Sequence, residues 1–416
     1  MSAPTAKTNS SNTPDDVRVP RESLGKLFLR FLRFGALAWG GPVAQIAMIR
    51  QELVEEEQWV TPAHFNRVLA VYQVLPGPEA HELCVYFGML ARGRTGGVLA
   101  GLGFMLPGFL LMFLLSWLYV RYGLQTGGAL GAVFAAVQAA VAALIVRAVH
   151  RIGGHVLADR WLWGIAATAT AAQLLGIHFS LILITGGLVY LLARENRARF
   201  AAALLAVLIA GTITWGIVKG FEFAGLGAAQ VTEGIRQAAP SYVGLFVSGL
   251  KAGLLTFGGA YTVIPFLQHD AVSAGAWMSN GEFLDGLALS GLLPAPLIIF
   301  ATFVGYVGGG PLGAVLLTIG IFLPAFAFTL LGHDAVERLV HQPRVREFLE
   351  GLTAGVVGLI AGTAIALVMV SVSSWQTMAI FALALAALFY SAKKLVVPGV
   401  IAGAAVLGFA LTFIGR

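Results

Sequence analysis

Apolar stretches of about twenty residues recur along almost the whole chain and constrain its fold more than any other feature. A helix of roughly that length crosses the ~30 Å hydrocarbon core of a bilayer. A chain of 416 residues that is 58% hydrophobic and only 11% charged is excluded from the soluble class. The sequence therefore predicts an all-α polytopic membrane protein with about 10 to 13 membrane segments. The candidate segments are 27–49, 68–90, 98–120, 129–150, 161–176, 178–193, 200–218, 242–267, 284–307, 312–332, 351–372, 375–390 and 395–414.

The charged residues stand in short clusters between these stretches. Their balance is +6, an excess that often indicates nucleic acid as a partner, but clusters beside apolar segments are typical of membrane-surface residues. The single cysteine, Cys84, excludes a disulfide framework, a thiolate zinc site and an iron–sulfur cluster. We expect the lipid bilayer as a partner and no nucleic acid, metal or cofactor.

The polar start of the chain, residues 1–23, predicts a disordered cytoplasmic tail. The apolar stretch that follows is long and leads into further segments, so we expect an integral segment and no cleaved signal peptide. Because Lys and Arg are retained on the cytoplasmic side, loop charge places the N-terminus inside. Segments 161–176 and 178–193 then form a hairpin, since one fused span would put Arg194, Arg197 and Arg199 outside. The same count places Arg147 and Arg151 on the cytoplasmic side.

The chain contains an internal duplication. A shift of 218 residues aligns 28–78 with 246–296 without a gap, and it brings Trp59 onto Trp277 together with paired glycines and paired prolines. Composition alone does not explain that register. The sequence therefore predicts a first repeat over 24–194, a linker over 195–241 that carries an extra membrane helix, and a second repeat over 242–416.

The repeats are predicted to be inverted relative to each other. Six segments and the linker segment precede the second repeat, and an odd number makes the two repeats enter from opposite faces of the membrane. That plan is typical of secondary transporters, with the site at the repeat interface near the midplane. A duplication that merely built a larger bundle is the alternative, because inverted repeats also occur in channels and membrane enzymes.

Proline and glycine predict four helix breaks. Such breaks survive in lipid only where protein or a water-filled cavity surrounds them, so we expect them to line one cavity. The helix that starts after Pro78 would aim its N–H groups into that cavity and favour an anion. Structural kinks are the alternative, and the first two segments of each repeat could also be re-entrant hairpins. The break residues are Gly40, Gly41 and Pro42; Pro76, Gly77 and Pro78; Gly258 and Gly259; and Pro294 and Pro296.

Charged residues within the segments are candidate functional groups, because a charge deep in a span is costly. Arg33 and Lys251 are equivalent under the repeat shift, so they could bind one divalent oxyanion from opposite sides. Snorkelling to the headgroups is the alternative. Glu79, His81 and Glu82 follow the PGP break and could couple proton movement to transport. Alternatively, the two acids only stabilise the first turn of the helix.

The order of several motifs resembles the chromate ion transporter family, in its long-chain, two-domain form. The motifs are FGxxxWGGPxAQIAMI (34–49), QxLPGP (73–78), VYFG (85–88) and LPGF (106–109), with weaker copies in the second half. The resemblance covers nearly the whole chain from about residue 24. It implies a multi-pass protein of the bacterial inner membrane that exports chromate, confers chromate resistance and meets sulfate as a competing analogue. PAP replaces PGP in the second half, so the halves need not act equally. A homodimer is one option for its assembly.

Three other functions stay open from the sequence. Sulfate or another tetrahedral oxyanion could be the physiological cargo. A membrane-embedded enzyme acting on lipid phosphates is a second option, although no Ser nucleophile or Arg stands beside PGP. An ion channel is a third. The absence of a GxxxxGK[ST] motif argues against a primary pump with its own nucleotide-binding domain, and we expect no enzymatic activity.

Overall fold

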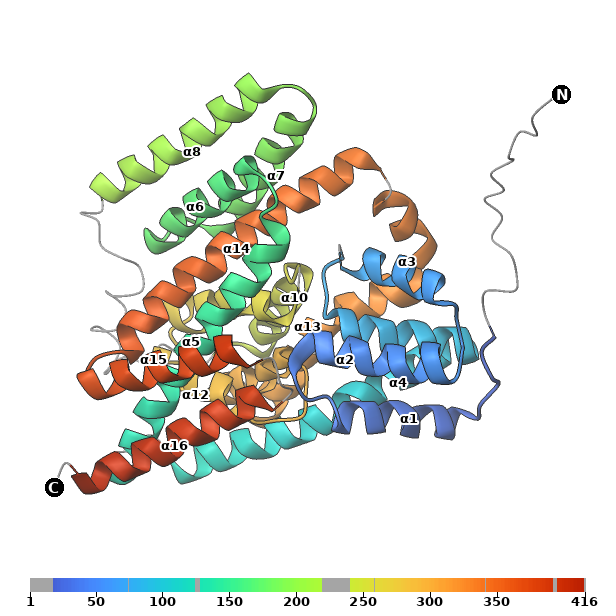
Figure 1. Cartoon of the computed structure of the whole chain (residues 1–416), viewed down its shortest axis with the longest axis horizontal. Helices are drawn as coiled ribbons and strands as arrows, with labels where there is room; N and C mark the ends of the chain where they lie inside the picture. The colour runs from blue at the N-terminus through green and yellow to red at the C-terminus, as the bar shows by residue number, and fades with distance from the viewer. Residues whose placement is uncertain are drawn as a thin grey trace.

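The computed structural model describes residues 18–73, 75–123, 128–218, 240–257, 259–340, 342–391 and 395–414. The elements of these ranges are helical, which confirms the predicted all-α fold (Figure 1). They are α1 (Leu24–Ala36), α2 (Gly41–Arg50), the π-helical turn η2 (Gln51–Glu56), α3 (Pro62–Tyr72), α4 (Glu79–Tyr122), α5 (Gly128–Val156), α6 (Arg160–Leu174), α7 (Phe179–Arg194), α8 (Ala198–Val218), α10 (Tyr242–Leu254), the 3-10 turn η3 (Ala260–Val263), α11 (Ile264–Gln268), the π-helical turn η4 (His269–Ala274), α12 (Asn280–Gly291), the 3-10 turn η5 (Leu297–Ile299), α13 (Phe300–Val340), α14 (Pro343–Ser371), α15 (Trp375–Tyr390) and α16 (Val396–Ile414).

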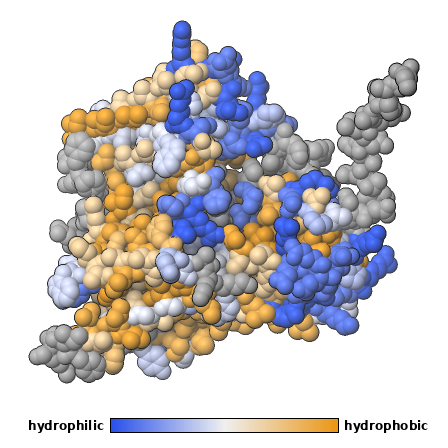
Figure 2. Space-filling model, viewed as in Figure 1, coloured by the Kyte–Doolittle hydropathy of each residue, from blue (hydrophilic) through white to orange (hydrophobic). Residues whose placement is uncertain are grey.

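Five of the described helices are long and apolar enough to cross a membrane, in α4, α5, α8, α13 and α14, and shorter apolar helices accompany them. Figure 2 shows hydrophilic side chains gathered over α1 to α3, at the connection between α7 and α8 and in a patch near the middle of this face, with mostly hydrophobic surface elsewhere.

The duplication is visible element by element. Ser23 caps α1 by accepting a hydrogen bond from the Lys26 amide, and Ser241 caps α10 in the same way from Gly244. The unusual π-helical turns η2 and η4 also stand at the same offset of 218 residues. Equivalent local sequences therefore fold into equivalent elements in the two repeats.

Helices α4 and α13 each double back on themselves at equivalent positions. Arg92 (φ −145°, ψ 30°) and Gly93 (φ 63°, ψ −158°) interrupt α4, and Gly309 and Gly310 interrupt α13 with nearly the same angles. A Cβ added at Gly88 would lie 2.4 Å from Ala100 Cβ, so the two parts of α4 pack closely against each other. We call residues 79–91 and 300–308 the short arms, and residues 94–122 and 311–340 the long arms.

The first apolar segment of the first repeat folds back on itself as a hairpin, α1 against α2 and η2. The Arg18 amide donates to the Trp59 carbonyl at 2.7 Å, and Arg30 of α1 forms ion pairs of 2.6 Å with both Glu22 and Glu57. The residues before α1 therefore lie beside those after η2. Had segment 27–49 crossed, these groups would stand on opposite faces, ~30 Å apart.

The second pair of segments in each repeat turns back in the same way. His64, at the start of α3, is hydrogen-bonded to the Tyr86 hydroxyl of the α4 short arm at 2.6 Å. In the second repeat, a Cβ added at Gly308 would lie 2.9 Å from the indole nitrogen of Trp277. Each repeat thus begins with two hairpins, a geometry that fits the re-entrant alternative, and re-entry into the membrane stays a prediction.

The two repeats run in opposite directions. On the long arms of α4 and α13, a Cβ added at Gly97 would lie 2.6 Å from the Leu330 side chain, and one added at Gly101 would lie 2.5 Å from the Phe326 ring. The contact residue number falls on α13 as it rises on α4, so these equivalent helices pack antiparallel. An antiparallel pair of equivalent helices is what an inverted repeat requires. The predicted inverted topology is confirmed.

The last two helices of each repeat pack on the other repeat. Helices α6 and α7 lie against α14, while α15 and α16 lie against α5 (Figure 1). Small residues permit the close approach: a Cβ at Gly358 of α14 would lie 2.4 Å from the Ala166 carbonyl oxygen of α6. The repeats are therefore intertwined and share one body.

The two predicted non-repeat regions are only partly described. Residues 1–17 of the predicted tail lie outside the described residues, and residues 18–23 contact the first hairpin. The linker contains α8, while residues 219–239 lie outside the described residues.

Candidate functional site

The PGP break meets the opposite repeat. Pro76, Gly77 and Pro78 are buried, and the amide of Gly77 donates to the carbonyl of Thr256 in the second repeat at 2.9 Å. A Cβ added at Gly77 would also lie 3.2 Å from Ala325 Cβ of the α13 long arm. The break that starts the α4 short arm thus lies at the interface between the repeats.

The PAP break makes the reciprocal contact. Pro294 is half-buried and Pro296 is buried. A Cβ added at Gly108 of the α4 long arm would lie 2.5 Å from Ala295 Cβ. Because Gly108 and Ala325 are equivalent positions, each break packs on the long arm of the other repeat.

The paired-glycine breaks differ in exposure between the repeats. Gly40 (φ 90°) and Gly41 (φ 76°) take left-handed backbone angles and lead into α2, with Gly40 exposed and Pro42 half-buried. In the second repeat Gly259 (φ 118°) is buried, and Gly258 lies outside the described residues. Positive φ is available to glycine at little cost, which explains glycine at these turns.

Glu82 and His81 are fully buried at the start of the α4 short arm. The His81 ring lies 4.9 Å from the Phe322 ring and 4.7 Å from the Phe326 ring, both in the second repeat. Among the described residues, neither the His81 ring nitrogens nor the Glu82 carboxyl oxygens have a hydrogen-bond partner. A buried ionisable group without a partner is costly, so both residues are strong candidates for function.

Arg147 and Arg151 bring positive charge toward this centre. Both are half-buried on α5, which continues to Val156. The charge of Arg151 acts on the half-buried Glu79 carboxyl, and both arginines act on Tyr261 of η3. Their spacing of four residues, which puts them on one helical face, was the signal in the sequence.

Arg147 is also fixed by contacts of its own. Its Nε donates to the Leu388 carbonyl of α15 at 3.2 Å, and its guanidinium lies 4.8 Å from the centre of the Phe389 ring. These contacts hold the side chain in place on a helix of the second repeat.

Arg33 and Lys251 each form an ion pair within their own hairpin. Arg33 pairs with Glu52 of η2, and Lys251 pairs with Asp270 of η4, at equivalent positions. The Arg33 side chain is 56% exposed and that of Lys251 is 33% exposed. An oxyanion bound by both cations would have to displace these carboxylates or share the cations with them. Binding of one dianion by Arg33 and Lys251 together stays a prediction.

The described residues contain no group of three or more His, Cys, Asp or Glu side chains placed to hold a metal ion. The residues gathered at the repeat interface are instead interrupted helices, buried acids and arginines. Two inverted repeats whose broken helices meet at a buried polar centre are an architecture typical of membrane transporters.

Comparison with known proteins gives the family. The family model described as chromate transporter matches residues 25–192 and 243–409, once in each repeat. The chain is 56% identical to the chromate transport protein of Pseudomonas aeruginosa, over 94% of this chain and 93% of that protein. It is 31% identical to the chromate transport protein of Cupriavidus metallidurans, over 96% of this chain and 98% of that protein. The chain belongs to the chromate transporter family. No solved structure matches it.

Proposed function

We propose that this protein exports chromate from the bacterial cytoplasm across the inner membrane and thereby confers chromate resistance. The observation that carries the proposal is the reciprocal contact of the PGP and PAP breaks with the opposite long arms, in a chain of the chromate transporter family. A site shared by two inverted repeats can be opened to one face and then to the other by rocking one repeat against the other.

The membrane potential is the proposed driving force. A dianion leaving a cell that is negative inside gains about 2 × 2.3 kcal/mol per 100 mV. Arg147 and Arg151 are the cations proposed to attract the anion toward the centre, and the N–H groups that begin the α4 short arm are proposed to bind it. The rest of the proposed substrate path is formed by Arg33 and Lys251 and by the breaks at 40–42, 76–78, 258–259 and 294–296.

Proton antiport through Glu79, His81 and Glu82 is the proposed coupling. In antiport the protons and the anion occupy the centre in turn. These residues would take up protons from outside after the anion has left, and they would give the protons up to the cytoplasm before the next dianion binds. The proposal assigns no catalytic role to these residues.

The test uses purified protein in proteoliposomes with a potential imposed by a potassium gradient and an ionophore. We expect labelled chromate to accumulate in the compartment that is made positive, and Arg151→Gln to lower the rate by about tenfold or more. Arg160→Gln, at the exposed start of α6, is the control and should leave the rate unchanged.

Flux that ignores the potential would refute the electrical driving force, and no chromate flux at all would refute the export proposal. Sulfate is the competing cargo. Unlabelled sulfate should slow chromate flux if it binds the same site, and sulfate flux without chromate flux would make sulfate the substrate.

A further inference from the structure

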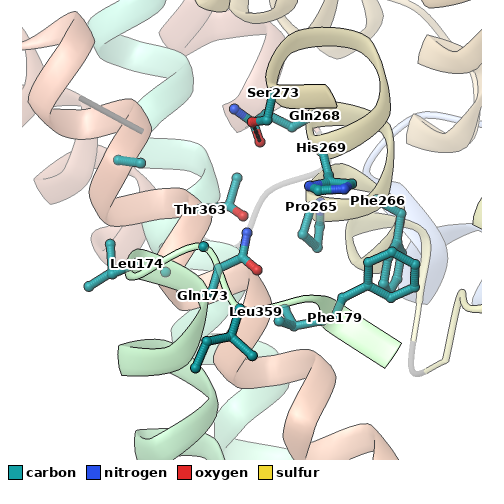
Figure 3. Close-up of a pocket in the computed structure, with 14 residues that line it drawn as sticks. Gln173, Leu174, Phe179, Pro265, Phe266, Gln268, His269, Ser273, Leu359 and Thr363 are labelled. Carbon is teal, nitrogen blue, oxygen red and sulfur yellow. Dashed lines mark hydrogen bonds between the residues drawn. The ribbon is translucent and has the colours of Figure 1, made fainter. Parts of the chain in front are cut away.

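A cavity of about 230 Å³, with polar side chains set among apolar ones, lies apart from the broken-helix centre. It is formed by the connection between α6 and α7 from the first repeat and by α11, η4 and α14 from the second (Figure 3). Its lining includes none of the break residues, and it does not include Glu79, His81 or Glu82. Its volume is several times the ≈30 Å³ that a water molecule occupies in the liquid, so it has room for a tetrahedral oxyanion with part of its hydration shell.

Hydrogen-bond donors from three elements converge on this cavity. Figure 3 shows Gln173 of α6 and Thr363 of α14 facing each other, with His269 and Ser273 of η4 across the space. Thr363 is only 3% exposed, and its hydroxyl has no hydrogen-bond partner among the described residues. A buried hydroxyl without a partner costs free energy unless a ligand or water satisfies it.

The acidic residue nearest in sequence to the lining His269 is already neutralised. Asp270 forms an ion pair with Lys251 and accepts a hydrogen bond from Ser248 at 2.7 Å. Lys251 Nζ lies 5.2 Å from the centre of the Phe179 ring, and Phe179 is part of the cavity wall. Neutral donors suit an acceptor-only anion, and the lining residues include no Asp or Glu that would suit a cation.

The equivalent place in the other repeat is cationic. Aligning α5 with α14 end to end places Arg147 and Arg151 at the positions of Gly362 and Ala366, which line the cavity. With the N-terminus inside, the α6–α7 connection is on the outer side, so the cavity lies toward the outside while the arginines lie toward the cytoplasm. Neutral donors hold a dianion less tightly than arginines do.

We propose that this cavity is a second oxyanion site on the outer side, which the dianion occupies between the broken-helix centre and release. This inference rests on the proposed function, because it takes a chromate-like dianion as the cargo. The Thr363 hydroxyl, the Gln173 amide and the His269 ring are its donors, and its weaker binding favours departure over return.

The experiment measures binding and transport on the same variants of the full chain. The first variant is Thr363→Val, which removes the hydroxyl and keeps the side-chain shape. The double variant combines Thr363→Val with Gln173→Leu. Thr329→Val is the matched control, because Thr329 is also buried with a hydroxyl that has no partner among the described residues but does not line the cavity. Labelled sulfate and labelled chromate are bound to purified protein at equilibrium, and proteoliposomes report chromate flux.

We expect two bound anions per wild-type chain. In the double variant the weaker binding should be lost, or its affinity should fall by about tenfold or more, and in Thr329→Val it should be retained. Chromate flux should slow in the double variant with the tighter binding unchanged. One bound anion in the wild type, or two with unchanged affinities in the double variant, would overturn the site. If the wild type shows no chromate flux but the double variant loses sulfate binding, the proposed function fails and the cavity still binds an oxyanion.

Discussion

The carboxyl group of Glu82 lies over the PGP break without a partner among the described residues. A Cβ added at Gly77 would stand only 2.8 Å from its Oε1 atom, so even a methyl group at Gly77 would push the acid aside. A buried carboxyl group without a partner is costly, so Glu82 is a candidate for carrying a proton through the centre.

Replacing Glu82 by Gln tests that role. With an imposed pH gradient, wild-type chromate flux should respond to the gradient, and Glu82→Gln flux should not, since the amide cannot bind the proton. The variant should unfold at the same or a higher temperature than wild type, because a buried ionisable group is removed. Glu55→Gln, an exposed residue of η2, is the control, and a gradient response that survives in Glu82→Gln contradicts the assignment.

Reversing the Arg33–Glu52 pair separates a structural role of Arg33 from a role in binding the anion. Arg33→Glu alone should lower stability by up to about 1 kcal/mol, the size expected of an exposed ion pair, and the double variant with Glu52→Arg should recover it in thermal unfolding. If Arg33 binds the substrate, chromate flux stays low in the double variant although stability returns. Recovery of both would remove Arg33 from the substrate path.

At the scale of elements, the turns inside α4 and α13 depend on one glycine each. Gly93 and Gly310 have φ near 63° with ψ near −155°, a region that is essentially confined to glycine. Each turn fixes how the short arm, which starts at the break, is held against its long arm. Loss of either turn should therefore disturb the buried centre as well as the fold.

Alanine at either turn should destabilise the protein. Gly93→Ala and Gly310→Ala are each expected to cost about 1–3 kcal/mol, seen as a lower midpoint of thermal unfolding in detergent. Gly25→Ala lies in helix α1 with open space around the added methyl group and should be neutral or slightly stabilising. Equal midpoints for all three variants would mean that the turns carry no strain.

Much of the arrangement of elements could be predicted from the sequence, because proline, glycine and the 218-residue register are local signals. These signals were enough to predict the helix breaks at 76–78 and 294–296 and the pairing of the two repeats. Whether segment 27–49 crosses could not be decided, since two half-helices joined by glycines have the same hydropathy as one span. The partners of Arg33 and Lys251 were also missed, although Glu52 and Asp270 stand in the same register and gave a usable signal.

At the scale of the whole molecule, the hairpin arrangement predicts on which side of the membrane the first hairpin of each repeat ends. In a Cys84→Ser background, chosen because Cys84 is buried, a cysteine at Glu56 should react with an impermeant thiol reagent from the cytoplasmic side. A cysteine at the equivalent Ala274 should react from the outer side. Both positions are exposed, so accessibility does not limit the test. The reverse result at both positions would mean that the first segments cross.

The packing of α6 and α7 on α14, and of α15 and α16 on α5, leaves neither repeat complete by itself. A single-repeat ancestor with this packing would have left its last two helices without their partner helix. It could have folded only as a dimer of two copies inserted in opposite directions in the same membrane. Fusion of the two genes, with α8 added to reverse the second copy, would have fixed an orientation that an unfused protein must leave to chance.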